Sequence, residues 1–318
     1  MNLKSQFISI LIVNIPNMNT KNINNNLSLW VTQAKTQVPR GKVLDRIPIL
    51  ATANPLWFAV HISLESGENY SLGDTACVFP FMSVIKPFSF LYLLEKFGLQ
   101  QVLQWVSVQP SDLAFNSLAQ LIADNSHPRN PMINSGAITL ADKLPGNNAD
   151  ESTQLFYEWL NKLANTQLYI DTNILTSVRA NRSQINIDIT KCLHQAGNVK
   201  NIEFALDIYE QICCICGRVE DLAKLGKVLA CQGDVINNQN RQMVNTVMLT
   251  CGLYEASAEY ALKIGFPMKS GISGALLAII PNRGAVASYS PALDSVGNSV
   301  AGLALMETLS VSSKNVYL

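Results

Sequence analysis

The stretch that decides the fold is Val78-Phe79-Pro80-Phe81-Met82-Ser83-Val84-Ile85-Lys86, an apolar run that ends in Ser-x-x-Lys. A helix is predicted from about Ser83 to Phe97, stopped by Gly98, which places the serine at the helix start. Because positions i and i+3 share one face of a helix, Lys86 can reach the Ser83 hydroxyl. A serine hydroxyl is a poor nucleophile until a base removes its proton, and a lysine that burial keeps uncharged can be that base.

A second motif lies far downstream. Pro267-Met268-Lys269-Ser270-Gly271-Ile272-Ser273-Gly274 precedes the apolar run 275–280, which predicts a strand or strand pair. Any surface helix can contain Ser-x-x-Lys, and alone that motif favours no function. Ser-x-x-Lys followed by Lys-Thr/Ser-Gly is, however, the motif pair of the serine β-lactamase and penicillin-binding superfamily. The two motifs together therefore favour an active site on the edge of a sheet.

Several longer strings narrow the family. They are Ile47–Ala51, Gly73-Asp74, Asn116, Pro128-Arg129-Asn130-Pro131-Met132-Ile133-Asn134-Ser135-Gly136-Ala137-Ile138, Met248–Tyr254 and Ser290–Val300. Together they closely resemble the serine-dependent glutaminase family, bacterial and mammalian kidney type. The resemblance extends from about Gly41 to about Gly302, which is most of the chain.

Strand patterns occur near the two ends of the chain, and helical patterns fill the middle. This predicts an antiparallel sheet built from both chain ends and flanked by helices, with an inserted all-helical lobe. The resemblance implies the same arrangement, an α/β fold that is β-lactamase/transpeptidase-like. We expect an Asn-rich, ill-ordered extension over 1–35 and a glutaminase domain over 36–312. Its sheet would come from about 41–80 and 262–312, and its helical lobe from about 98–260. The active site would lie in the cleft between the two parts.

The resemblance implies a role for each catalytic residue. Ser83 would be the nucleophile, Lys86 its base and Tyr209 a proton shuttle. A phenol held between two ammonium groups would have a lowered pKa and could pass a proton to the leaving ammonia. A lone helical tyrosine can also serve packing alone. The backbone N–H groups of Ser83 and Ile272 would form the oxyanion hole.

Asn134 and Tyr254 match substrate-contacting positions of the family. Asn134 would hydrogen-bond the substrate, although an asparagine after Pro131 can also simply fix a turn.

The chain departs from the family pattern at several places. In the family, a glutamate and an asparagine bind the charged ends of the amino acid. Thr176 stands at the position of the glutamate and Ser183 at that of the asparagine. After a small shift of the alignment, Asn181 could take the place of Ser183. Met82 replaces a glutamine before the nucleophile, and Arg46 replaces a tyrosine before Ile-Pro.

Two functions follow from the resemblance and its departures. The first is a glutaminase that hydrolyses the side-chain amide of L-glutamine with water to L-glutamate and ammonia through a Ser83 acyl-enzyme. The second is a catalytically weakened relative with an altered ligand or a binding or regulatory role. The first is favoured by the retained Ser83, Lys86, Tyr209 and Lys269. The second is favoured by the changes at Thr176 and Ser183. A penicillin-recognising enzyme shares the two short motifs but lacks the Asn-Pro-Met-Ile-Asn string.

Composition sets further limits on function. The 318 residues contain 23 Lys+Arg and 23 Asp+Glu, a balance that argues against a nucleic-acid partner. Only 14% of residues are charged and 48% are apolar, which favours a homo-oligomer, dimer or tetramer. No run of about 20 apolar residues is present, so we expect no membrane span.

Seven cysteines, an odd number in mostly apolar text, predict reduced thiols and a cytoplasmic location. Cys213-Cys214-Ile215-Cys216 contains Cys-x-x-Cys, a zinc or redox motif, but no second pair accompanies it. The three histidines do not cluster, and the resemblance implies neither a metal nor a cofactor. The apolar run Phe7–Val13 loosely resembles a signal peptide. It is followed by an Asn-rich sequence without a cleavage site, so we favour an N-terminal extension over a signal peptide.

Overall fold

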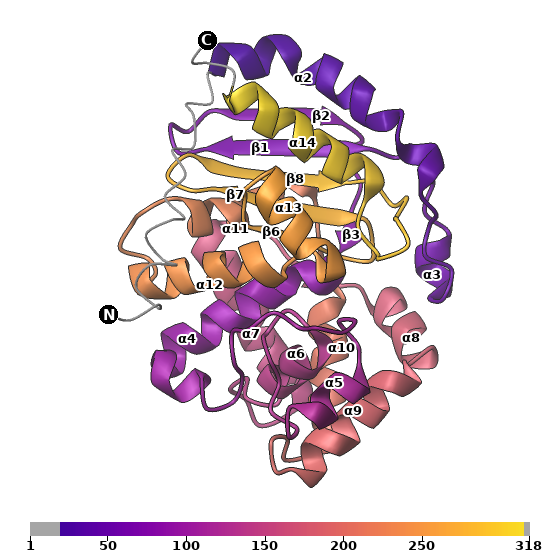
Figure 1. Cartoon of the computed structure of the whole chain (residues 1–318), viewed down its shortest axis with the longest axis vertical. Helices are drawn as coiled ribbons and strands as arrows, with labels where there is room; N and C mark the ends of the chain where they lie inside the picture. Colours follow the sequence, from indigo (N-terminus) through magenta and orange to yellow (C-terminus); the bar gives the residue numbers. More distant parts are fainter. Residues whose placement is uncertain (1–19, 315–318) are drawn as a thin grey trace.

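Residues 20–314 are described by the structure, a computed structural model in which a five-stranded sheet lies above a group of helices (Figure 1). All strand pairs of the sheet are antiparallel. In spatial order the strands are β2 (Asn69–Gly73), β1 (Ala59–Leu64), β8 (Gly284–Tyr289), β7 (Ala275–Ile280) and β6 (Met268–Ser270). Strand β1 pairs with β8, which confirms that the two ends of the chain build one sheet.

The central strands are buried on both faces, and alternate residues enter two separate cores. Val60, Ile62 and Leu276 face α14 (Val300–Lys314) and α2 (Thr20–Lys35). Residues of opposite parity, such as Leu277 and Ala285, face α11 (Val219–Ala230) and the larger core. A Cβ at Gly226 of α11 would lie 2.6 Å from side-chain atoms of both Leu277 and Ala285, so glycine permits this close helix–sheet approach.

Helix α2 corrects the expectation of an ill-ordered extension. Residues 20–35 form a helix whose apolar side chains are buried against α14 and the outer face of the sheet: Ile23, Leu27, Trp30, Val31 and Ala34. Their spacing of three and four residues is that of one helix face, which the many intervening asparagines obscure in the sequence. Residues 1–19, with the apolar run Phe7–Val13, lie outside the described part.

The helical lobe packs below the sheet (Figure 1). Its helices are α5 (Leu118–Ala123), α6 (Asn134–Ala141), α7 (Ala149–Ala164), α8 (Thr172–Ala180), α9 (Gln184–Gln195) and α10 (Ile202–Cys213). It is not wholly helical, because β3 (Phe79–Pro80), β5 (Ile215–Gly217) and β4 (Tyr169–Ile170) form a small antiparallel sheet.

The lobe is also shorter than predicted. Helix α11 covers the large sheet, and α12 (Asn238–Cys251) contacts helix α4 (Lys86–Val102) and strand β6.

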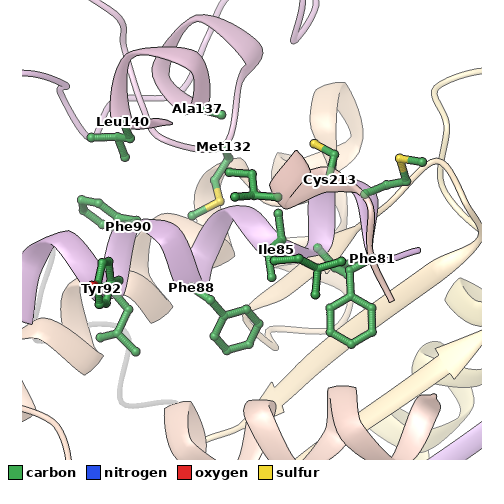
Figure 2. Close-up of a cluster of buried hydrophobic side chains, with 14 of the residues drawn as sticks. Phe81, Ile85, Phe88, Phe90, Tyr92, Met132, Ala137, Leu140 and Cys213 are labelled. Atoms are coloured by element: carbon green, nitrogen blue, oxygen red, sulfur yellow. The ribbon is translucent and has the colours of Figure 1, made fainter. Parts of the chain in front are cut away.

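Helix α4 (Lys86–Val102) runs through the middle of the molecule, preceded by a 3-10 turn, η2 (Met82–Ile85). Figure 2 shows Phe88 and Tyr92 along α4 and Ala137 and Leu140 above it on α6. Pro87 lies in the first turn, where its missing N–H is harmless, and Gly98 interrupts the helix with a φ of 76°. The nucleophile candidate Ser83 thus lies in a turn whose four residues are all buried.

Candidate active site

A cleft of about 1130 Å³ contains the predicted nucleophile in its wall. Five of the predicted site residues line it: Ser83, Asn134, Ser183, Tyr209 and Ile272. Lys86 and Tyr254 are buried behind its surface and do not line it. Thr176 also lies outside the lining.

Lys86 is completely buried, and its surroundings account for its charge state. Its Nζ donates to the Met132 carbonyl at 3.1 Å and to Asn134 Oδ1 at 2.8 Å. No carboxylate accepts from it among residues 20–314. Burial is the main cause that lowers the pKa of Lys86 to about 8, and Cys213 opposes the shift.

A neutral lysine suits this environment because an uncharged amine has two N–H groups and one lone pair. The two N–H groups match the two acceptors, Met132 O and Asn134 Oδ1. The lone pair is then left to accept a proton from Ser83, which stands one helical turn away with 7% of its surface exposed to the cleft.

Asn134, the first residue of α6, joins three other side chains. Its Oδ1 accepts from Lys86 and also from the Tyr209 hydroxyl at 3.2 Å, and its Nδ2 donates to Asn186 Oδ1 at 2.9 Å. A Cβ at Gly136 would lie 2.0 Å from the carbonyl oxygen of Asn130, so the glycine lets the Asn-Pro-Met-Ile-Asn loop lie against α6.

Tyr209 lies on α10, and the direction of its pKa shift differs from the expected one. The expectation of a lowered pKa is wrong: burial, the largest cause, raises the pKa of Tyr209 well above its usual value. Lys86 Nζ is 5.9 Å from the ring centroid. The hydroxyl therefore keeps its proton and acts as a hydrogen-bond donor to Asn134.

Tyr254 and Lys269 form a second buried layer behind the nucleophile. The Tyr254 hydroxyl donates to the Ser270 carbonyl at 3.1 Å, and Lys269 Nζ lies 4.3 Å from the tyrosine ring centroid. Burial raises the pKa of Tyr254, and a side-chain hydrogen bond with Ser83 partly offsets the rise. Tyr254 contacts Ser83 and does not line the cleft, and its expected substrate contact stays a prediction.

Lys269 donates to the Gly252 and Ser270 carbonyls at 3.0 and 2.7 Å. Burial, followed by the charge of Lys86, holds its pKa well below the ordinary value for lysine.

The turn after β6 lies directly against η2. A Cβ at Gly271 would approach the carbonyl oxygen of Phe81 to 2.6 Å, which shows how closely the Lys-Ser-Gly strand passes the nucleophile. The next residue, Ile272, lines the cleft together with Ser83. N–H groups at the start of a helix, such as that of Ser83, have no intrahelical partner and are available to a ligand.

The structure does not bring Thr176 to the cleft. Thr176 is exposed on α8, and its hydroxyl donates to the Thr172 carbonyl one turn earlier at 2.7 Å. Ser183 does line the cleft, as the residue before α9, and its side chain makes no capping hydrogen bond. The alternative residue Asn181 lines it too, although its Nδ2 donates to Ser177 O.

A buried ion pair supports this wall of the cleft. Arg182 donates to both carboxylate oxygens of Glu210, at 2.8 and 2.9 Å, and to exposed Glu203 at 2.7 Å. The Glu210 carboxylate is therefore already engaged.

Charged side chains surround the mouth of the cleft. Arg40, Lys42 and Arg46 lie on a segment tied to Leu293 by two backbone hydrogen bonds of 2.8 and 2.9 Å. Asp294 holds the following loop, since its Oδ1 accepts from three backbone N–H groups. These residues suit small polar ligands better than apolar ones.

None of the cysteines lines the cleft. All seven are free thiols in the structure. Within residues 20–314 no group of His, Cys, Asp and Glu side chains is arranged to hold a metal ion. In that same part of the chain, no helix has the length and apolar content needed to cross a bilayer.

Two features of the site could not be found from the sequence. Asn186 touches Asn134 only because α9 packs on α6, and no motif marks it. The pair Arg182–Glu210 joins residues on different helices in the same way.

An antiparallel sheet with a Lys-Ser-Gly edge strand, placed against a serine one turn from a buried lysine, is the arrangement of the β-lactamase-like fold. The family model for glutaminase matches residues 41–317, and the chain belongs to the glutaminase family.

Individual relatives agree with this assignment. A curated glutaminase of Synechocystis sp. is 41% identical over 282 residues, which cover 88% of this chain and 86% of the relative. Two solved structures of Bacillus subtilis glutaminases superpose with TM-scores of 0.84 and 0.81 at 26% and 27% identity. They cover 95% and 91% of this chain and 99% and 97% of their own.

Proposed function

We propose that this protein hydrolyses the side-chain amide of L-glutamine to L-glutamate and ammonia, with Ser83 as the nucleophile. The observation that supports it most is the state of Lys86, wholly buried, with its pKa lowered to about 8 and its N–H groups matched by two acceptors. Such a lysine can act as a base near neutral pH, beside a serine that faces a cleft.

In the first half-reaction Ser83 Oγ attacks the carbonyl carbon of the amide and its proton passes to Lys86 Nζ. The N–H groups of Ser83 and Ile272 would hold the oxyanion that forms. The C–N bond then breaks as the amide nitrogen takes up the proton from Lys86, and ammonia leaves. Tyr209 remains protonated and holds the Asn134 side chain to which Lys86 also donates.

In the second half-reaction a water molecule attacks the γ-glutamyl ester on Ser83. Lys86 takes the water proton and returns it to Ser83 Oγ when the ester bond breaks, which releases L-glutamate. Asn134 and Ser183 in the cleft would contact the substrate, while Thr176, to which the alignment assigns a contact, does not line the cleft and donates its hydroxyl to Thr172 O.

The relatives support the substrate assignment. One Bacillus subtilis glutaminase was solved in complex with 6-diazo-5-oxo-L-norleucine, a glutamine analogue. A second Bacillus subtilis structure is a covalent complex of a glutaminase with 5-oxo-L-norleucine, formed by reaction of that protein with 6-diazo-5-oxo-L-norleucine.

Purified protein should release ammonia from L-glutamine, and Ser83→Ala should reduce the rate by about 10³-fold or more while the protein stays folded. After treatment with 6-diazo-5-oxo-L-norleucine, mass spectrometry should find the adduct on Ser83 in the parent and nowhere in the variant. Full activity of the variant, or an adduct on another residue, would overturn the mechanism.

A weakened relative with a binding role is the second candidate. It is favoured by the placement of Thr176 outside the cleft, which leaves the position of the family's glutamate without a carboxylate. Binding of L-glutamine by calorimetry without ammonia release would select this candidate.

The same proposal includes an assembly and a location. We infer a homo-oligomer, a dimer or homotetramer, from the small charged fraction of 14%, and light scattering of the purified protein tests it. A cytoplasmic location fits seven free thiols, which a reducing compartment preserves.

A further inference from the structure

The amide of Asn134 stands between the two groups that hold protons in the site. Its Oδ1 accepts from Lys86 at 2.8 Å and from Tyr209 at 3.2 Å, and these two donors occupy both lone pairs of the oxygen. Its Nδ2 faces the opposite way and donates to Asn186 Oδ1 at 2.9 Å. Asn134 is largely buried, with 7% of its surface exposed at the wall of the cleft.

A primary amide can turn over with little change of shape, because its oxygen and nitrogen are nearly equal in size. Turned over, Asn134 would present N–H groups to Lys86 and Tyr209. An N–H donor beside neutral Lys86 would take the lone pair of its nitrogen, which in the observed orientation is free for Ser83. The orientation of this one amide therefore decides whether Lys86 can act as a base.

We propose that Asn186 is a positioning residue for the reaction: by accepting the Asn134 Nδ2–H, it holds that amide with Oδ1 toward Lys86 and Tyr209. This inference rests on the proposed function of the same site. The backbone of Asn186 is held in the first turn of α9, because its N–H is bonded to Ser183 O at 3.0 Å and its carbonyl accepts from the Thr190 hydroxyl at 2.7 Å.

The other groups around Lys86 come from different elements. Tyr209 and Cys213 approach from α10, and Lys269 approaches from β6. A substitution of Asn186 leaves all three in place. A change in the pH dependence of the reaction would then have one of two causes: a changed orientation of the Asn134 amide, or a charge introduced at position 186.

Two substitutions separate these effects. Asn186→Leu removes the acceptor, and we expect kcat at the pH plateau to fall about tenfold or more with KM within about threefold of the parent. The pH midpoint should move to lower pH, because an N–H donor to the lone pair stabilises neutral Lys86. Asn186→Asp can only accept, so it should keep the plateau, while its negative charge moves the midpoint to higher pH.

The control is Gln195→Leu, an amide-to-leucine change at an exposed position near the end of α9. It should leave kcat, KM and the pH midpoint unchanged. Thermal unfolding of all variants, followed by circular dichroism, verifies that each is folded under assay conditions.

An Asn186→Leu variant with the parent plateau and midpoint would refute the positioning role. An Asn186→Asp variant that loses activity as the leucine variant does would refute it too, because the acceptor would then not be what matters. The parent is assayed in parallel: a parent that releases no ammonia overturns the proposed function and this inference together, whereas an active parent with insensitive variants overturns only this inference.

Discussion

Lys86 sets the pH dependence of the proposed reaction. Its pKa is lowered to about 8, mainly by burial, and the base must be neutral to act. Below that pH the ammonium form dominates, so kcat/KM should fall by about tenfold for each pH unit and level off above pH 8.

Ammonia release measured from pH 5.5 to 9.5 checks this. Lys86→Met introduces a side chain of similar length. This variant should lose about 10²-fold or more in kcat, and its rate should no longer fall tenfold per pH unit below pH 8. An unchanged profile in that variant would assign the base to another group.

Substrate recognition can be tested at two positions that the alignment treats alike but the structure separates. Ser183 lines the cleft, and Ser183→Asn should lower KM for L-glutamine roughly fivefold by adding an amide that hydrogen-bonds a charged group. Asparagine is also well tolerated before a helix.

The matched variant is Thr176→Glu, on the exposed side of α8, and it should change KM by less than about twofold. Steady-state kinetics of both variants measure the difference. A large drop in KM for Thr176→Glu would mean that α8 turns toward the cleft when glutamine binds.

At the scale of elements, the approach of β6 to η2 is a tightly constrained contact of the site. In Gly271→Ala the new Cβ would meet Phe81 O at 2.6 Å, and backbone cannot give way as a side chain can. We expect the strand to move from the nucleophile, with a loss of about 1–3 kcal/mol in the free energy of unfolding and at least about a tenfold loss in kcat.

Gly233→Ala is the control, since nothing lies within 4 Å of a Cβ built there. Urea unfolding and ammonia release are measured for both. Equal behaviour of the two variants would contradict the tight contact.

The elements also show how far the sequence alone could lead. The hairpin of β1 and β2, the helix after Ser83 with its stop at Gly98, and the strands from β6 to β8 follow from local patterns that depend on turns and periodicity. Helix α2 could not be predicted because asparagines lie between its apolar residues and obscure their helical spacing. The packing of α11 on the large sheet could not be predicted either, because the residues of a helix do not reveal which element it packs against.

The site shows the same division. Ser83 and Lys86 are one turn apart and could be predicted as a pair. The raised pKa of Tyr209 could not, because it depends on how completely other elements bury the phenol.

At the scale of the whole molecule, α2 closes the outer core of the sheet. Trp30 is buried there, and Trp30→Ala should cost about 3–5 kcal/mol of unfolding free energy. Activity at 25 °C should change little, because the helix lies on the face of the sheet away from α11 and the larger core, in which Tyr209 is buried.

The neighbouring Leu29, 54% exposed, provides the control Leu29→Ala, for which we expect less than about 0.5 kcal/mol. Equilibrium unfolding in urea measures both. A stable Trp30→Ala variant would show that α2 contributes nothing to the core.

The pairing of β1 with β8 has a consequence for biosynthesis. Ala59 lies opposite Tyr289, so the middle of the sheet joins residues from the first and last quarters of the chain. At ribosomal rates of about 5–20 residues per second, the nascent chain waits roughly 10–45 s between the emergence of the two strands. During that interval β1 and its apolar face lack their neighbour, and trigger-factor-like holdases have their longest opportunity to bind. The helical lobe, complete earlier, can form first and keep the growing chain compact until the last strand arrives.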